Sequence, residues 1–341
     1  MTMQKIASIR EITDIKQIDK SENFERAIID GGWSVVVEKN QYSSGQKVVY
    51  IQPGAWIPSK LASVGESGIY KGIRGGQLKI IKKSGIYSEG MIIPLDKIKN
   101  ISEDSDIDQI YNVQKWERII SEEFSGVSKG VYPSYIETPS YDHCQNLNHQ
   151  IFNEHINDQY EITTKLDGIP MSVYVKGGRV GVFSNGINFK ETPTNYFWKL
   201  ARNINIIEKI KEFYEDSNKW NFAIHGVVVG EGIYANAEKI KERRFFMHDI
   251  YDITNKKFVD PEKRHKLYIP LSEGTLLDHL PVLANRVTMP YIAKNMDELV
   301  AYADGPSIAP FTKRKGLVFK SYNSDFSFKV RSNLYSIANR L

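Results

Sequence analysis

The stretch YEITTKLDGIPMSVYVK, residues 160–176, decides the fold of the second half of the chain. Apolar and β-branched residues on both sides of its centre predict two strands. Between them, Gly168 and Pro170 impose a turn, which places Lys165 at the end of the first strand, facing the cavity that the sheet forms. Asp167 lies two residues further on and points to the same side of an extended chain.

A lysine amine at the end of a strand can serve as a nucleophile. It attacks a phosphorus or carbonyl centre only when it is deprotonated, and burial near another positive group lowers its pKa. Asp167 could then orient the amine of Lys165 or a hydrated metal ion. Because the pattern K-x-D-G is short, a lysine in a solvent-exposed turn is the alternative that this segment alone leaves open.

The sequence around this stretch predicts a domain that mixes strands and helices. Apolar residues recur at helical spacing between Thr194 and Asp216, which predicts one long helix. A shorter helix is expected over Gln109–Glu122. Further strands are expected at Arg179–Ser184, Ala223–Val229, Phe245–Ile253, Leu317–Ser321 and Phe326–Val330.

The first hundred residues predict a separate all-β domain. Short β-branched runs, punctuated by Gly, Pro and Asn, predict about five strands and a small closed barrel, either OB-like or SH3-like. The polar stretch NISEDSDID, residues 100–108, marks a boundary, so we expect an OB-like domain over residues 1–100 and a second domain over residues 101–341. The strands expected in the barrel are Ala27–Asp30, Trp33–Glu38, Lys47–Gln52, Gln77–Ile81 and Met91–Ile93.

The composition excludes several classes of protein. The 341 residues fit roughly two domains. A formal charge of +4 permits a nucleic-acid partner without requiring one. The single cysteine, Cys144, excludes a disulfide framework and favours a reducing compartment such as the cytoplasm. We expect no signal peptide and no membrane span, and the phosphate loop of common kinases is absent from the sequence.

K-x-D-G is also the nucleotidyl-acceptor motif of the covalent nucleotidyltransferases, which comprise DNA ligases, RNA ligases and mRNA capping enzymes. The chain resembles this superfamily because five further segments resemble its strand motifs in the same order. An OB domain ahead of these motifs, which Ile6–Pro58 resembles, is typical of one group of ATP-dependent RNA ligases. The five segments are Gly181–Asn185, Ile224–Ile233, Arg244–Ile250, Lys315–Lys320 and Phe328–Arg331.

The resemblance implies a fold and an activity. The fold is α+β, with an OB-like β-barrel followed by a nucleotidyltransferase (ATP-grasp-like ligase) domain of antiparallel sheets and helices. The activity is ATP-dependent joining of 3′-hydroxyl and 5′-phosphate RNA ends through a lysyl-AMP intermediate, with Mg or Mn as the metal and RNA repair as the setting. RNA ends, single-stranded or in a nicked duplex, are the implied partners.

The resemblance also implies roles for individual residues. Lys165 is the nucleophile, Asp167 holds a metal through a bound water, and Lys329 and Arg331 contact the α-phosphate. The other nucleotide-binding positions implied are Gly168, Ser184, Asn185, His248 and Lys320.

The chain departs from the family pattern at several positions: the arginine of one motif is missing, with Asn185 nearest, His248 replaces a Phe, and Arg331 replaces a Lys. Two other departures are more serious. Glutamates are expected where this chain has Val227 and Lys315. Valine holds neither a nucleoside nor a metal, and an ammonium about 4 Å from a cation costs roughly 4 kcal/mol at an effective dielectric of 20. We therefore keep open a catalytically silent relative that binds nucleic acid or senses nucleotides. A DNA ligase or a capping enzyme that uses GTP is the weaker alternative.

The barrel offers candidate contacts for RNA. Trp33, Tyr50 and Trp56 could stack on bases, and Lys47 could contact phosphates. The alternative is that these aromatic side chains form the interior of the barrel.

Overall fold

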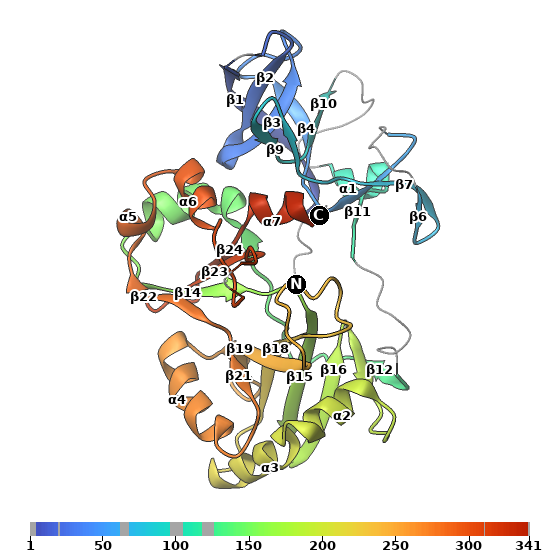
Figure 1. The fold of residues 1–341 in the computed structure, drawn as a ribbon, viewed down its shortest axis with the longest axis vertical. Coiled ribbons are helices and arrows are strands. Elements are labelled where there is room, and N and C mark those ends of the chain that lie inside the picture. The colour runs from blue at the N-terminus through green and yellow to red at the C-terminus, as the bar shows by residue number, and fades with distance from the viewer. Residues whose placement is uncertain are drawn as a thin grey trace.

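The computed structural model describes residues 5–19, 21–61, 68–95, 105–117, 126–309 and 311–339. Figure 1 shows the N-terminal barrel at one end, a large sheet with helices at the other, and a smaller central sheet between them. Within the described residues, no helix is both long and apolar enough to cross a membrane.

An antiparallel five-stranded sheet forms the barrel, in the order β10-β4-β1-β2-β3. Its two ends meet because the N–H of Glu89, just before β10, donates to the carbonyl of Ser34 in β3 at 2.6 Å. Trp33 and Tyr50 are buried in the core of the barrel. The prediction that these two residues contact RNA is therefore wrong, and the alternative that they form the interior of the barrel is confirmed. The strands are β1 (Ala7–Gln17), β2 (Phe24–Ile29), β3 (Trp33–Glu38), β4 (Lys47–Ile51) and β10 (Met91–Pro94).

A four-stranded sheet, in the order β11-β5-β7-β6, extends the barrel. The carboxylate of Asp108 in α1 accepts hydrogen bonds from the N–H groups of Ile6 and Ala7, at 3.0 and 2.7 Å, and so ties the helix to β1. The elements are β5 (Ala55–Pro58), β6 (Gly68–Tyr70), β7 (Ile73–Gln77), the hairpin of β8 (Ile81–Lys83) and β9 (Ile86–Ser88), α1 (Ile107–Tyr111) and β11 (Gln114–Lys115).

The helix predicted over Gln109–Glu122 is confirmed only for residues 109–111 and is wrong for residues 112–117. α1 ends at Tyr111 because Asn112 adopts a left-handed conformation, and the chain continues as β11. Residues 118–125 lie outside the described residues. The strand predicted over Gln77–Ile81 is also wrong, since β7 ends at Gln77 and β8 begins at Ile81.

The central sheet has five strands in the order β13-β24-β23-β14-β22. β14, β23 and β24 pair antiparallel, and the short β13 pairs parallel to β24. Tyr160, Phe319 and Phe328 from this sheet pack with apolar side chains of two short helices. The elements are β13 (Asp142–His143), β14 (Tyr160–Lys165), β22 (Val282–Val287), β23 (Gly316–Ser321), β24 (Ser327–Arg331), α5 (Met289–Ile292) and α6 (Met296–Tyr302).

The large sheet has the order β12-β17-β16-β15-β18-β19-β20, with β21 beside β19. Apolar side chains of α2 and α3 form one core with this sheet, which they cover in Figure 1. The elements are β12 (Ser128–Val131), β15 (Ile169–Lys176), β16 (Arg179–Ser184), β17 (Ile187–Phe189), α2 (Tyr196–Asn203), α3 (Ile206–Asp216), β18 (Phe222–Val229), β19 (Arg244–Asp252), β20 (Lys257–Phe258), α4 (Pro261–Ser272) and β21 (Asp278–His279).

The single helix predicted over Thr194–Asp216 is instead two helices. Asn205 has a φ of 60°, which interrupts the helical path between α2 and α3. The carbonyl of Ile204 accepts a hydrogen bond from the N–H of Leu276 at 3.0 Å, outside the helix. The other predicted strands overlap observed ones, and the α+β fold class is confirmed. The predicted division at residue 100 stays a prediction, because residues 96–104 lie outside the described residues.

Candidate active site

Lys165 ends β14 at the place where the central and large sheets meet. β14 pairs with β23, so Lys165 lies opposite Gly316, and the chain then turns into β15 of the large sheet. A Cβ on Gly168 would lie 2.2 Å from the carbonyl oxygen of Val228, so only glycine allows this turn to approach β18. The predicted turn is present, and it holds Lys165 between the sheets.

Lys165 lines a cavity of about 300 Å³. Of the described residues that line this cavity, five are lysines and none is Asp or Glu. A cavity of this size with cationic walls suits a small polyanion. The lysines come from four strands and the segment before β23, and they are Lys115, Lys165, Lys315, Lys320 and Lys329.

Burial, together with nearby positive charge, changes the protonation of these ammonium groups. Burial, followed by the ammonium of Lys315, lowers the pKa of Lys165 to about 8. Burial and the nearby charge of Lys165 lower the pKa of Lys329 well below its usual value. Burial lowers the pKa of Lys320 to about 8, although the carboxylate of Asp249 opposes the shift. An anion in the cavity would relieve this repulsion.

Asp167 is buried beside the cavity, and both of its oxygens have partners. The ammonium of Lys315 lies 2.6 Å from Oδ1, and the hydroxyl of Tyr335 donates to Oδ2 at 2.8 Å. Tyr335 comes from α7 (Asn333–Ala338), the helix that follows the last strand. The ammonium of Lys315 thus lies beside Asp167, where the family resemblance implies a metal ion bound through water.

His248 and Lys320 line the cavity on the side of β19. The ammonium of Lys320 donates to the carbonyl oxygen of His248 at 2.7 Å and also to the carboxylate of Asp249. Nδ1 of His248 lies 3.0 Å from the same carboxylate, which fixes the imidazole ring. Both predicted residues are therefore present at the cavity, held by a carboxylate of β19.

Lys329 and Arg331 both belong to β24, but only Lys329 lines the cavity. A Cβ on Gly54 of the barrel would lie 3.6 Å from Nη2 of Arg331, so this guanidinium lies at the barrel. Burial lowers the pKa of Arg331, and Tyr50 and Glu89 of the barrel oppose that shift. The predicted contact of Arg331 with a phosphate remains a prediction.

Gly168 lines the cavity, whereas Ser184 and Asn185 are absent from its described lining. The buried hydroxyl of Ser184 donates to the carbonyl of Pro170 at 2.5 Å, and the amide of Asn185 donates to the Ser184 hydroxyl at 2.9 Å. These bonds brace the turn that follows Gly168. The predicted nucleotide contacts of Ser184 and Asn185 stay predictions.

Two residues at the site were not predicted from the sequence. Lys115 lines the cavity from β11, in a segment for which we expected a helix. Tyr335 reaches Asp167 from α7. The signal for α7 was Ser332, whose hydroxyl accepts from the N–H of Tyr335 at 3.1 Å as a helix cap.

The described residues do not form a metal site of protein ligands. No group of three or more His, Cys, Asp or Glu side chains among them could hold a metal ion. The two oxygens of Asp167 contact an ammonium and a phenol, and Val227 lines the cavity as an apolar group. The predicted water-mediated metal contact of Asp167 stays a prediction.

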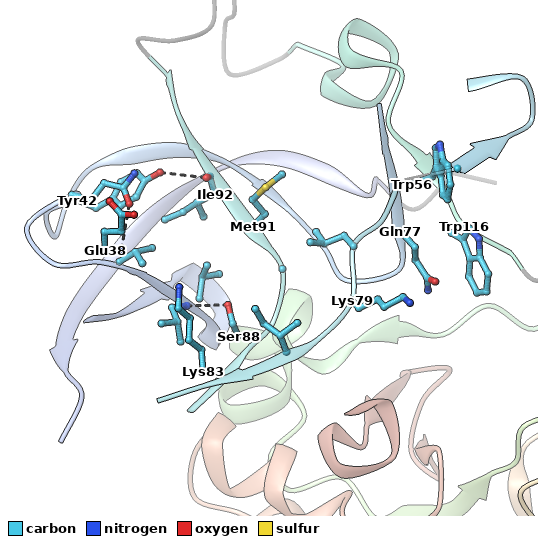
Figure 2. A pocket seen from close by; sticks show the side chains of 18 residues that line it. Glu38, Tyr42, Trp56, Gln77, Lys79, Lys83, Ser88, Met91, Ile92 and Trp116 are labelled. Carbon is cyan, nitrogen blue, oxygen red and sulfur yellow. Dashed lines mark hydrogen bonds between the residues drawn. The ribbon is translucent and has the colours of Figure 1, made fainter. Parts of the chain in front are cut away.

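A second, larger cavity of about 820 Å³ opens on the barrel. Figure 2 shows Trp56 and Trp116 at one end of this barrel groove, and Tyr42 and Glu38 at the other. Lys79 and Lys83 also line it. Trp56 lines the groove but is buried, at 7% exposure, so its predicted contact with RNA stays a prediction, while Lys47 is exposed and is not part of the lining.

Comparisons with known proteins agree with this architecture. A family model described as RNA ligase matches residues 158–331, and a model of an OB-fold domain matches residues 6–95. The second match identifies the barrel as an OB fold rather than an SH3-like barrel. No curated protein sequence matches the chain.

Solved structures of an RNA ligase from Naegleria gruberi are similar over nearly the whole chain. A lysine-to-alanine variant solved with ATP and Mn is 32% identical, with a TM-score of 0.88, and the alignment covers 98% of this chain and 99% of that one. The same enzyme with pyrophosphate is 32% identical, with a TM-score of 0.88 and 99% of both chains covered. The family model and these structures together show that the chain belongs to the RNA ligase family.

Proposed function

We propose that this protein is an ATP-dependent RNA ligase that joins 3′-hydroxyl and 5′-phosphate RNA ends through an AMP attached to Lys165. The observation that carries the proposal is the position of Lys165, at a strand end in a cavity lined by five lysines. The relatives support it, because the Naegleria structures contain ATP, AMP or pyrophosphate. These three compounds are the substrate, the transferred group and the leaving group of one adenylyl transfer.

In the first step, the neutral amine of Lys165 attacks the α-phosphorus of ATP. A nitrogen–phosphorus bond forms, the bond from the α-phosphorus to the bridging oxygen breaks, and pyrophosphate leaves with the electron pair. The amine gives up its proton to water. A pKa of about 8 leaves part of the Lys165 population neutral near neutral pH, and Lys329 is the group that we assign to the α-phosphate.

His248 and Lys320 are the groups that we assign to the nucleoside side of the cavity. The imidazole of His248 is planar and fixed by Asp249, so it can stack on adenine. Bound to the triphosphate of ATP, Mg²⁺ or Mn²⁺ supplies positive charge that offsets the charge developing on the leaving group.

In the later steps, AMP moves from Lys165 to the 5′-phosphate of RNA, and a 3′-hydroxyl then displaces AMP. We assign the barrel groove to the RNA strand that leads to the end being joined. Trp116, which is partly exposed, offers an aromatic face for a base, and Lys79 and Lys83 offer positive charge for phosphates. Repair of broken RNA in a reducing compartment is the setting that we infer, in line with a single buried cysteine.

A second function is supported by Val227 and Lys315. An apolar side chain and an ammonium stand at two positions where we expected carboxylates. A relative that binds nucleotide or RNA without transferring AMP would keep the cationic cavity and the barrel groove.

Incubation with radiolabelled ATP and Mn²⁺ separates the two functions. We expect label on the intact protein, and we expect Lys165→Met to abolish it. Lys313→Met is the matched control, because Lys313 is exposed and does not line the cavity. Binding of ATP without any label would favour the silent relative, and the absence of both binding and label would refute the ligase.

A further inference from the structure

The ion pair between Lys315 and Asp167 is the feature of the site that the reaction above leaves unused. The carboxylate of Asp167 is almost inaccessible, at 2% exposure of its side chain, while the side chain of Lys315 is 30% exposed and lines the cavity. The buried Asp167 therefore holds the ammonium of Lys315 in place, and the ammonium remains able to contact a ligand bound in the cavity.

The backbone fixes this ammonium close to Lys165. Lys315 immediately precedes Gly316, which pairs with Lys165 across β14 and β23. A Cβ on Gly316 would lie 2.2 Å from the carbonyl oxygen of Val330, so the strand is locked against β24 at this residue. The carbonyl of Lys315 accepts a hydrogen bond from the N–H of Ser332 at 3.1 Å, which ties the backbone to the start of α7.

The described lining of the cavity contains no Asp or Glu that could serve as a ligand for a divalent cation. Mg²⁺ and Mn²⁺ prefer several oxygen ligands. Tyr335 already donates to the second oxygen of Asp167, and Val227 offers the cavity only methyl groups. A lysine ammonium, in contrast, needs only one carboxylate to neutralise it and brings three donors of its own.

We propose that the ammonium of Lys315, held by Asp167, provides the positive charge beside the α-phosphate in place of a divalent cation bound by the protein. This inference rests on the proposed function and specifies how its nucleotide is held. Metal then reaches the site only with the triphosphate of ATP. AMP, which has no triphosphate, binds without metal.

The test measures AMP binding by calorimetry to the intact protein, once with EDTA and once with Mn²⁺. We expect the same affinity in both solutions. Affinity that appears only with Mn²⁺ would overturn the inference and leave the proposed function standing. If neither AMP nor ATP binds in either solution, the proposed function fails as well.

Titration with Mn²⁺ alone, followed by electron paramagnetic resonance, gives a readout that requires no nucleotide. We expect no Mn²⁺ site that depends on Asp167 in the wild type. A site that Asp167→Asn removes would overturn the inference, and this result does not depend on the folding of any Lys315 variant.

Lys315→Glu directly tests whether the ammonium takes the place of a metal ion, because the substitution puts a second carboxylate beside Asp167. We expect AMP affinity in EDTA to fall about tenfold or more, the size of one lost charge-assisted contact, and Mn²⁺ to restore it. Lys313→Glu, with the same charge change at an exposed lysine, should leave AMP affinity unchanged. Unaltered AMP affinity in a folded Lys315→Glu protein would refute the role of Lys315.

Discussion

The side-chain amide of Asn333 donates a hydrogen bond to Oε1 of Glu89 across 2.8 Å, and both residues are buried. Glu89 lies just before β10 of the barrel, and Asn333 begins α7, the helix that carries Tyr335 to Asp167. The OB domain is therefore tied to the same short helix that fixes the carboxylate of the active site.

Asn333→Ala should destabilise the folded protein. The substitution removes a donor from a buried carboxylate, which costs about 1–3 kcal/mol for an unsatisfied buried group. Urea denaturation of the full chain measures the loss. Asn153→Ala is the control, because the amide of Asn153 donates to the carbonyl of His149 at an exposed site, and its removal should change the stability little. Equal losses for the two variants would contradict the importance of this contact.

The stability should also depend on pH through Glu89. Burial raises the pKa of Glu89 above 4.5, although the hydrogen bond from Asn333 opposes the shift. A carboxyl whose pKa is higher in the folded state stabilises the fold below the unfolded pKa, and this contribution is lost as pH rises through the folded pKa. Wild type should therefore lose stability relative to Glu89→Gln as pH rises above about 4.5. Urea denaturation at several pH values measures the unfolding free energy of both proteins. A difference between them that stays constant as pH rises would refute the prediction.

The position of Lys165 could be predicted from sequence because it depends on neighbours in the chain. A β-branched strand, the glycine at 168 and the proline at 170 define the turn within a few residues. Several strands of both sheets could be predicted from similar local patterns, but not which strands pair. The break at Asn205 could not be predicted in this way, since apolar spacing continues across it while one backbone angle changes sign.

Contacts between distant parts of the chain could not be predicted from the sequence. Lys315 and Asp167 are separated by 148 residues, so the sequence gives their identities but not that one neutralises the other. Alternation along β24 correctly puts Lys329 and Arg331 on one face, yet the docked barrel lies beside Arg331 and leaves only Lys329 in the lining. The site is thus shaped by how the domains pack, which no local pattern specifies.

The rate of AMP attachment should rise with pH through the pKa of Lys165. Only the neutral amine attacks phosphorus, and burial together with Lys315 lowers the pKa of Lys165 to about 8. Lys315→Met removes the second cause, so the midpoint of the profile should move to higher pH. Initial rates measured from about pH 6 to about pH 10 test both statements. A midpoint that stays in place or falls in Lys315→Met would show that the two amines do not interact.

Trp116→Ala should weaken the binding of single-stranded RNA and leave AMP attachment unchanged. Trp116 lines the barrel groove, whereas the indole of the neighbouring Trp56 also donates to the carbonyl of Ile73 at 3.1 Å and supports the barrel itself. Loss of one stacked base corresponds to about 1–3 kcal/mol, or about 5- to 150-fold in affinity. Fluorescence anisotropy of a labelled oligonucleotide at constant salt measures the change. Tyr291→Ala is the control, because Tyr291 in α5 is 88% exposed and does not line the groove. RNA affinity that falls equally in both variants, or in neither, would place the RNA strand elsewhere on the molecule.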